Sequence, residues 1–393
     1  MKANPFLLGP LMSMATRTVS QIANPTFWED FADLDIIRVD DTFYYSASNM
    51  HYSPGAPLLK SYDLLNWEFA GHSIPELTFG SEYYLEGGNH AYIRGTWAST
   101  LNYRPSTSTF YWMGCIDGTT YIYTAPNADG PWTQASTINK CYYDCGLLIT
   151  DDDKMYVAYG NSGISVAELS DDGLSEVSSQ MVFPTDDAGY LEGSRFYQHN
   201  GNFYIFVVHP ANEEHVLMST SGVFGPYERR LLISDAGNPV SGAGYPHQGG
   251  PISTATIHLN TSSMFSGDRA GLSLLRHSSA WIGVVNDGGT SHIGVTTGLE
   301  MDSDWNTVST GTESARAEFS GSEIWLRVEA DITPYAGSGQ FSYSLDGVTF
   351  TNLGDTYELN NNWEFFMGYR FGIFNFATTG TGGSVVLNSF VLS

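Results

Sequence analysis

Short runs of alternating apolar and polar residues, each ended by a polar turn, fill the first 250 positions of the chain. Such alternation predicts hairpins of antiparallel strands. Three segments repeat one pattern of an acid, an apolar strand, a turn and an aromatic second strand. They are DLDIIRVDDTFYYSAS from Asp33, DCGLLITDDDKMYVAYG from Asp144 and EGSRFYQHNGNFYIFVV from Glu192. A third strand follows each pair, and helical periodicity is missing, so this part of the chain is predicted to be all-β.

Two less regular units begin at Trp97 and His247, which gives five starts spaced by roughly 50 residues. Strand-only repeats of this length are typical of a β-propeller. In that architecture the innermost strand of each blade starts at one mouth of a central channel. Asp33, Asp144 and Glu192 occupy equivalent starts, so they are predicted to share one small cavity.

The repeat is lost from residue 253 onward. The segments STATIHLN, RAGLSLLR, AWIGVVND, IWLRVEADI, QFSYSLDGVTF, FFMGYRFGIFNFA and SVVLNSFVLS predict the strands of an antiparallel sandwich, with Asp346-Gly347 as a hairpin turn. The fold class is therefore all-β. We expect an N-terminal segment over residues 1–21, a β-propeller over 22–250 and a β-sandwich over 251–393.

Charge excludes some classes of partner. The formal net charge is −26, with 15% charged and 14% aromatic residues. Such a field repels nucleic acid and anionic membranes, whereas a neutral polysaccharide is indifferent to it. Aromatic rings suit sugar faces, although they also fill β-rich cores. No apolar run is long enough to span a membrane. The start MKANPFLLGPLMSMA is a weak secretion signal, so we expect the protein to be extracellular. We also expect it to be a monomer.

The chain has three cysteines and lacks a C-x-x-C motif, which argues against a zinc site. An odd number allows one disulfide at most. We predict the pair Cys115–Cys141, which leaves Cys145 reduced.

Three acids in one cavity suit glycoside hydrolysis. That reaction needs a carboxylic acid for the leaving oxygen and a carboxylate that activates water or attacks directly. A third acid raises the pKa of its neighbour, because like charges resist ionising together. The acids in the turns at 40–41 and 151–153 are expected to be solvated. Those at the strand starts are flanked by apolar or aromatic residues that would bury them.

Several ordered motifs resemble glycoside hydrolase family 43, and most closely its fungal α-L-arabinofuranosidases and β-xylosidases that act on arabinoxylan. The motifs are NPTFWEDFADLDIIRVDDTFYYSAS, SPGAPLLKSYDLLNW, WASTL, CYYDCGLLITDDDKMYVAYGN, EGSRFY and HQGG. The C-terminal stretches GDRAGLSLLRHSSAWIGVV and FFMGYRFGIFNFA are similar to the concanavalin-like jelly roll of those enzymes. The resemblance covers nearly the whole chain.

The resemblance implies a role for each acid in an inverting reaction. Asp33 corresponds to the general base, Asp144 to the aspartate that modulates a pKa, and Glu192 to the general acid. Asp144 would hold Glu192 in place and keep it protonated near neutral pH. The base could also be misassigned. The three acids that crowd the same segment, and so remain alternatives, are Asp35, Glu29 and Asp30.

Other positions are candidates for binding. Trp28 and Trp97 are candidate sugar platforms or core residues, and Tyr143 is expected to line the pocket. Arg195 would pair with a pocket carboxylate or a sugar hydroxyl, or form a structural ion pair. The resemblance places His247 in the channel, where it would contact substrate and a structural Ca²⁺ ion. The chemistry itself requires no cofactor.

The expected fifth blade is incomplete. In the family, more strands follow the HQGG segment before the sandwich, whereas here Pro251 already begins the sandwich-like sequence. We therefore expect a ring of about four blades and a stub.

The predicted function is release of α-L-arabinofuranosyl groups from arabinoxylan. A β-xylosidase acting on xylo-oligosaccharides is the close alternative, because the same acids serve both reactions. An inactive or carbohydrate-binding product of such an enzyme remains open. A propeller for protein partners is the least favoured reading, since the low charge and the aromatic blade starts suit sugars better.

Overall fold

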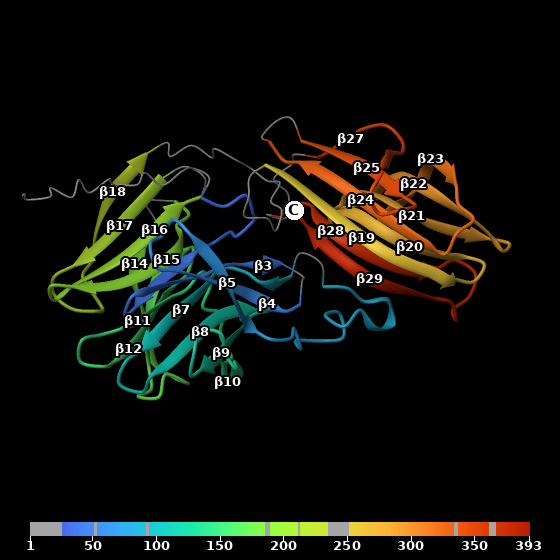
Figure 1. Cartoon of the computed structure of the whole chain (residues 1–393). Helices are drawn as coiled ribbons and strands as arrows, with labels where there is room; N and C mark the ends of the chain where they lie inside the picture. Colours follow the sequence, from blue (N-terminus) through green and yellow to red (C-terminus); the bar gives the residue numbers. More distant parts are fainter. Residues whose placement is uncertain are drawn as a thin grey trace, which may run out of the picture.

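The computed structural model describes residues 26–393 apart from seven short gaps: 51–52, 92–93, 185–188, 211–212, 235–250, 334–336 and 361–366. Strands make up both lobes of the molecule, a propeller lobe and a sandwich lobe, which lie side by side (Figure 1). Within these residues the structure has no α-helix, only the short 3₁₀ turn η1 (Glu86–Gly88). No helix of this part of the chain has the length and apolarity needed to cross a membrane.

Four antiparallel sheets of four strands each form the propeller lobe, and each sheet is one blade. Blade 1 contains β1 (Asp35–Val39), β2 (Thr42–Ser46), β4 (Gly55–Ser61) and β5 (Trp67–Ile74), and blade 2 contains β7 (Ser99–Arg104), β8 (Thr109–Ile116), β9 (Thr119–Ala125) and β10 (Thr133–Ile138). Blade 3 contains β11 (Gly146–Ile149), β12 (Met155–Tyr159), β13 (Gly163–Leu169) and β14 (Glu176–Pro184), and blade 4 contains β15 (Glu192–His199), β16 (Asn202–His209), β17 (Glu213–Ser219) and β18 (Glu228–Ser234). A two-residue pairing of β3 (Asn49–Met50) with β6 (Gly95–Thr96) links blades 1 and 2.

The first strand of each blade is the innermost. Strand β1 lies beside β7, β7 beside β11, and β11 beside β15. Together these four strands line a central cavity of about 290 Å³. Apolar side chains fill the space between successive blades, as Trp112 does between blades 1 and 2 and Ile205 between blades 3 and 4. This packing fixes the strand starts at one end of the channel, as the sequence repeat predicts.

Two sheets form the sandwich lobe. The larger sheet contains, in spatial order, β26 (Thr351–Asn352), β25 (Ser338–Ser344), β24 (Glu323–Asp331), β19 (Ile252–Ser263) and β29 (Ser384–Leu392), with β27 (Tyr357–Glu358) also paired to β25. The smaller contains β23 (Thr307–Glu318), β22 (Thr290–Met301), β21 (Ser278–Asp287), β20 (Asp268–Leu275) and β28 (Arg370–Ala377). Their facing sides enclose one apolar core that includes Ile257, Leu272, Ile282 and Phe341.

Some strands of the structure are not predicted by the alternation of apolar and polar residues. Each blade has an outermost fourth strand that the pattern does not predict. Strands β10, β14 and β18 are largely exposed, so both of their faces tolerate polar residues and the alternation disappears. Strands β22 and β23 were missed because they are rich in Ser, Thr, Gly and charged residues, although residues 292–296 of β22 are buried.

The fifth repeat unit cannot be followed in the structure. Residues 235–250, which include His247 and the HQGG segment, lie outside the described residues. On the near side β18 ends at Ser234, and on the far side β19 of the sandwich begins at Ile252. The incomplete fifth blade therefore stays a prediction.

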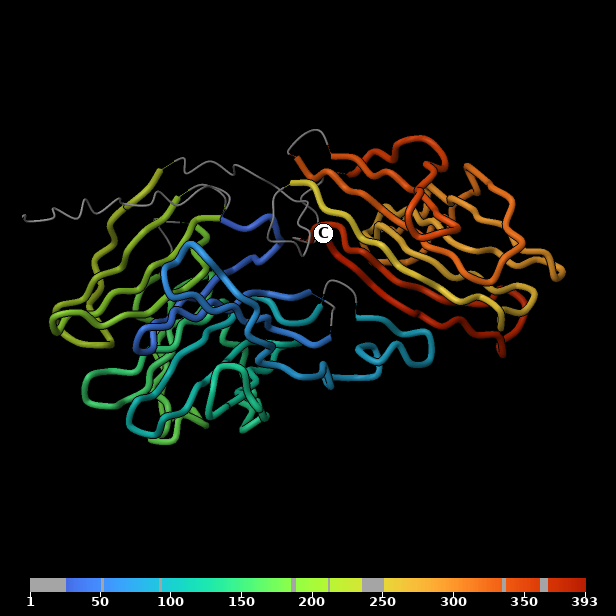
Figure 2. The backbone as a smooth tube through the Cα atoms, viewed as in Figure 1, coloured from blue at the N-terminus to red at the C-terminus, as the bar shows by residue number. Residues whose placement is uncertain are grey.

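The lobes meet at the segment that precedes β1. The half-buried Trp28 of this segment packs against the core of the sandwich. Met50 of the propeller forms a small apolar cluster with Trp305 and Met367 of the sandwich. Figure 2 shows this blue segment between the two lobes, with its next residues beside the green strands of blade 4.

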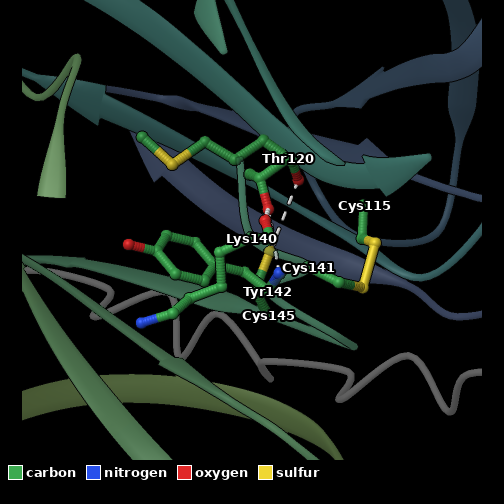
Figure 3. The surroundings of a disulfide bond; sticks show 7 residues. Cys115, Thr120, Lys140, Cys141, Tyr142 and Cys145 are labelled. Carbon is green, nitrogen blue, oxygen red and sulfur yellow. Dashed lines mark hydrogen bonds between the residues drawn. A yellow bond between two sulfur atoms is a disulfide. The ribbon is translucent and has the colours of Figure 1, made fainter. Parts of the chain in front are cut away.

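The predicted disulfide is confirmed. Cys115, in β8, is bonded to Cys141, in the loop before β11, and Cys145 is reduced and buried (Figure 3). The bond joins blade 2 to the loop that carries Asp144, and it closes a loop with a sequence separation of 26 residues. Beside it, Thr120 accepts a hydrogen bond from the backbone N–H of Tyr142 at 2.8 Å.

Replacing both cysteines, Cys115→Ser with Cys141→Ser, is expected to lower the free energy of unfolding of the propeller by about 3 kcal/mol, since the cross-link restricts the unfolded chain. Urea unfolding followed by near-UV circular dichroism measures the change. Reductant should destabilise the unaltered protein to a similar extent and leave the double variant unaffected. Equal stability of all these samples would contradict the prediction.

Candidate active site

The three acids singled out in the sequence stand where the innermost strands begin. Asp33 and Asp144 lie two residues before β1 and β11, and Glu192 is the first residue of β15. Both aspartates have left-handed backbone conformations, with φ of 56° and 48°. Such φ values are uncommon outside glycine, although Asp adopts them more readily than most residues. The chain therefore turns sharply at each aspartate as it enters the strand.

Blades 3 and 4 approach closely at these starts. The backbone N–H of Gly193 donates to Oδ2 of Asp144 at 3.2 Å, and that of Ser194 donates to the Asp144 carbonyl at 3.0 Å. Gly193 has a φ of 73°, and the register of β15 against β16 shifts between Glu192 and Arg195. A bulge of this kind re-aims the side chain next to it. Gly146 is needed here too, because a Cβ atom would lie 2.5 Å from the Ser194 carbonyl oxygen.

Arg195 joins blade 1 to this pair. Its guanidinium donates to the carbonyl oxygens of Leu34 at 2.7 Å and Asp33 at 3.0 Å. It also donates to the carbonyls of Ser194 at 2.9 Å and Cys145 at 3.2 Å. The Asp35 carboxylate lies 3.7 Å from Nε, and the Arg195 side chain is only 14% exposed. These contacts favour the structural ion pair over a direct bond to sugar.

The carboxylate of Asp33 is fixed by a hydrogen bond from Ser48. Ser48 Oγ donates to its Oδ2 at 2.5 Å, and the Ser48 backbone N–H donates to the Ala32 carbonyl at 3.0 Å. Ser48 was not singled out in the sequence. Its position two residues after the second strand, in YYSAS, is the signal that the sequence offers.

The alternative acids have other partners. Asp35 is buried and accepts from Thr100 Oγ1 at 2.8 Å and from the Leu101 backbone N–H at 3.0 Å. Asp30 is bonded to Arg370 of the sandwich. Burial raises the pKa of Glu29 to about 7, with the charge of Asp30 adding to the effect and Arg370 opposing it. Asp35 and Asp30 are thus each engaged with partners of their own, and the assignment of Asp33 as the base stays a prediction.

Electrostatics tie the three acids together. Burial raises the pKa of Asp144 to about 7, and the charges of Glu192 and Asp33 raise it further, while Arg195 and the Gly193 N–H oppose them. Like charges within reach of one another resist ionising together. Asp144 is therefore protonated at mildly acidic pH and ionises near neutrality. The raised pKa appears on the acid that the resemblance assigns as the modulator.

A chain of hydrogen bonds ends on Glu192. Tyr143 donates to Glu192 Oε2 at 3.1 Å, and its oxygen lies 3.2 Å from the hydroxyl of Tyr190, which accepts from Asn161 Nδ2 at 3.0 Å. Burial raises the pKa of the Tyr143 phenol, as do the Tyr190 contact and the charges of Asp144 and Glu192, so Tyr143 remains a donor. Tyr143 thus lies beside the acids, as predicted, whereas Tyr190 and Asn161 were missed.

The remaining candidates are Trp28, Trp97 and His247. The packing of Trp28 against the sandwich core does not support its role as a sugar platform. Trp97 follows β6 directly and is 40% exposed, and its role stays a prediction. His247 lies outside the described residues.

The expected calcium ion stays a prediction, because its predicted ligand His247 lies outside the described residues. No group of three or more His, Cys, Asp or Glu side chains able to hold a metal occurs in the part of the chain that the structure describes. Arg195 already lines the channel beside Asp35 and contributes positive charge there. A calcium site would depend on His247, and no step of the chemistry below uses one.

The chain thus combines a β-propeller that carries three interacting carboxylates at its mouth with a β-sandwich, an arrangement suited to glycoside hydrolysis. Residues 22–247 match the family model of glycosyl hydrolases family 43. Residues 247–392 match the model of the β-xylosidase C-terminal concanavalin A-like domain. The chain belongs to glycosyl hydrolase family 43, whose members related to it are enzymes.

Curated relatives include a β-xylosidase of Formosa agariphila, 28% identical over 243 residues, which span 53% of this chain and 40% of the relative. The non-reducing end α-L-arabinofuranosidase BoGH43B of Bacteroides ovatus is 27% identical over 267 residues, or 65% of this chain and 45% of the relative. The chain spans less than half the length of these curated relatives.

Solved structures share the fold. One comes from work on engineering the active site of a GH43 glycoside hydrolase to give both endo-xylanase and exo-arabinofuranosidase activity. It superposes with a TM-score of 0.88 at 34% identity, covering 94% of this chain and 99% of that chain. A xylan β-1,4-xylosidase from Bacillus halodurans is similar in fold, with a TM-score of 0.76 at 16% identity over 95% of this chain and 100% of the other.

The raised pKa of Asp144 predicts a pH-dependent effect of Asp144→Asn on stability. The folded protein binds the Asp144 proton more tightly than the unfolded chain does. Protonation of Asp144 therefore contributes fully to the free energy of unfolding below about pH 4, and this contribution is lost as the pH rises through about 7. As the pH rises between these two values, the free energy of unfolding of Asp144→Asn should increase relative to that of the unaltered protein by roughly 2–4 kcal/mol. Urea unfolding at several pH values measures the difference. A difference independent of pH would contradict the assignment.

Proposed function

We propose that the protein is an inverting glycoside hydrolase that releases α-L-arabinofuranosyl groups from arabinoxylan. The observation that carries the proposal is the meeting of Asp33, Asp144 and Glu192 at the mouth of the channel, seen in the shared electrostatics of Asp144. Family membership supports glycoside hydrolysis. The arabinofuranosidase name of the Bacteroides ovatus relative supports the substrate, as does the exo-arabinofuranosidase activity named for the 34% identical structure.

In the proposed reaction Asp33 is the base. Its carboxylate, held by Ser48, takes a proton from the water that attacks the anomeric carbon. The bond from that carbon to the leaving oxygen breaks as the water oxygen bonds to the opposite face, which inverts the configuration. Each base needs a lone pair aimed at its water, and the hydrogen bond from Ser48 fixes the plane of the carboxylate.

Glu192 is the acid that donates a proton to the leaving oxygen, so the xylan chain departs as a neutral alcohol. Tyr143 orients the Glu192 carboxyl through its hydrogen bond to Oε2. The protonation states of Asp144 and Glu192 are linked, because each charge opposes the other. Asp144 is itself fixed by the backbone of Gly193 and Ser194, one and two residues after the acid.

A β-xylosidase acting on xylo-oligosaccharides is the second candidate. The names of several curated relatives favour it, including the β-xylosidase of Formosa agariphila. The three acids serve both sugars equally, so the products of hydrolysis decide between the candidates. A carbohydrate-binding protein without activity is the third, and it depends on whether the ring around the acids is complete. In each case the proposed partner is a neutral polysaccharide or oligosaccharide and the protein is an extracellular monomer.

Hydrolysis of wheat arabinoxylan by the 393-residue chain tests the proposal directly. We expect release of arabinose, quantified by chromatography, with no release by Glu192→Gln, which keeps the shape of the side chain but cannot donate the proton. Xylose without arabinose from xylo-oligosaccharides would select the second candidate. No release from folded protein that still binds xylan would select the third.

The roles of the two acids can be separated with aryl glycosides that carry a good leaving group. Such substrates need little help from the acid, so Glu192→Gln should regain much of its activity, while Asp33→Asn should remain slower than the unaltered protein by a factor of about 10²–10⁴. Initial rates of aryl α-L-arabinofuranoside and β-xyloside hydrolysis give the comparison. The opposite pattern would mean that the two roles are exchanged.

A further inference from the structure

The segment that carries Asp33 is fixed from the sandwich lobe as well as from its own blade. On the propeller side, Phe27 and Phe31 pack against Tyr45 and Trp67 of blade 1. On the other side, the adjacent residue Trp28 packs into the sandwich. The residues that lead into β1 are therefore held between the two lobes, with Phe27 and Phe31 packed on the propeller and Trp28 on the sandwich.

A largely buried ion pair crosses this junction. Arg370, the first residue of β28, bonds through Nη2 to both carboxylate oxygens of Asp30. The backbone N–H of Gly368 adds a bond to Oδ2 of Asp30 at 3.0 Å. The two side chains are only 23% and 11% exposed. Removing one partner from such a pair leaves the other charge without compensation, which is costly.

Short backbone links join Asp30 to Asp33. The Ala32 N–H donates to the Asp30 carbonyl at 3.0 Å, and the Ala32 carbonyl accepts from the Ser48 N–H at 3.0 Å. The same Ser48 donates through Oγ to the Asp33 carboxylate. A shift of Asp30 would therefore be passed to the base by way of Ala32 and Ser48.

The surroundings leave room for such a shift. A cavity of about 640 Å³ lies between blade 1 and the sandwich, and its lining includes Glu29, Asp30, Ser48 and Arg370. Packed side chains would resist movement of the segment, but a cavity does not. Asp33 also has the left-handed φ of 56°, a conformation that persists only when its surroundings hold it. Both partners of the ion pair, Asp30 and Arg370, line this cavity.

We propose that Arg370 of the sandwich is a positioning residue for the base Asp33, so that the second lobe completes the active site. The expected loss of activity rests on the proposed function, whereas the expected change in hydrogen exchange rests only on the contacts at the junction. Arg370 acts through Asp30 and does not need to touch the substrate. Burial and the charge of Asp30 raise the pKa of the neighbouring Glu29 to about 7, and the charge of Arg370 opposes this rise.

Arg370→Ala is expected to lower kcat on an aryl glycoside by about 10- to 100-fold, because a displacement of about 1 Å has effects of this size, while KM changes less than threefold. Hydrogen–deuterium exchange of residues 29–35 should become at least about tenfold faster, because this segment then opens locally. Arg370→Lys retains the charge and should recover part of both losses.

Arg269→Ala is the matched control. Arg269 belongs to the adjacent strand β20, is 16% exposed and pairs with Asp287 at 2.9 Å, away from the propeller segment. The Arg269→Ala substitution should lower the unfolding temperature. It should not change hydrogen exchange at residues 29–35, and its kcat should equal that of the unaltered protein at a temperature where both are folded.

Unchanged exchange at residues 29–35 in folded Arg370→Ala would overturn the proposal, whatever the activity. So would equal losses of kcat in Arg370→Ala and Arg269→Ala. If the unaltered protein releases no sugar while exchange still rises in Arg370→Ala alone, the proposed function fails and the structural coupling stands. If Arg370→Ala does not fold, Asp30→Asn removes the same ion pair from the propeller side and must show the same exchange and kcat effects.

Discussion

The hydrogen bonds of one guanidinium hold the candidate site together. Arg195 reaches from blade 4 to the backbone of Asp33 and Leu34 in blade 1, and to that of Cys145 in blade 3. Backbone carbonyls that converge at a channel mouth cannot bond to one another, so they need a donor with several N–H groups in one plane. Arg195 supplies that donor, and Asp35 offsets its charge. The starts of three innermost strands are thereby set at a fixed separation.

This arrangement explains why the acids at those starts influence one another. Asp33 and Asp144 lie just before two strands that Arg195 joins, and Glu192 lies three residues before Arg195 on the same strand. The sharp left-handed turns at the two aspartates and the bulge at Gly193 direct their side chains, while Ser48 and Tyr143 hold two of the carboxyls by hydrogen bonds. The rest of the propeller serves to keep these few backbone positions in place, and the sandwich supports the first of them through Arg370.

Sequence reasoning predicted the parts of the molecule that depend on periodic burial. Strands with one buried face, such as β19 and β24, keep their alternation and were predicted, as were the positions of the three acids near the strand starts. The exposed fourth strands and the polar β22 and β23 carry no such signal. Ser48, Tyr190 and the Asp30–Arg370 pair were also missed, since each depends on contacts between residues far apart along the chain. Arg195 was named, but its partners are backbone carbonyls, which no side-chain pattern reveals.

The central claim is that Asp33, Asp144 and Glu192 form one electrostatically coupled cluster. Titration of the Asp144 carboxyl by ¹³C NMR, in the unaltered protein and in Glu192→Gln, tests it most directly. We predict that Asp144 titrates near pH 7 and that loss of the Glu192 charge lowers its pKa measurably. A titration near pH 4 in both proteins would contradict the account, because Asp144 would then be neither buried nor close to the other acids.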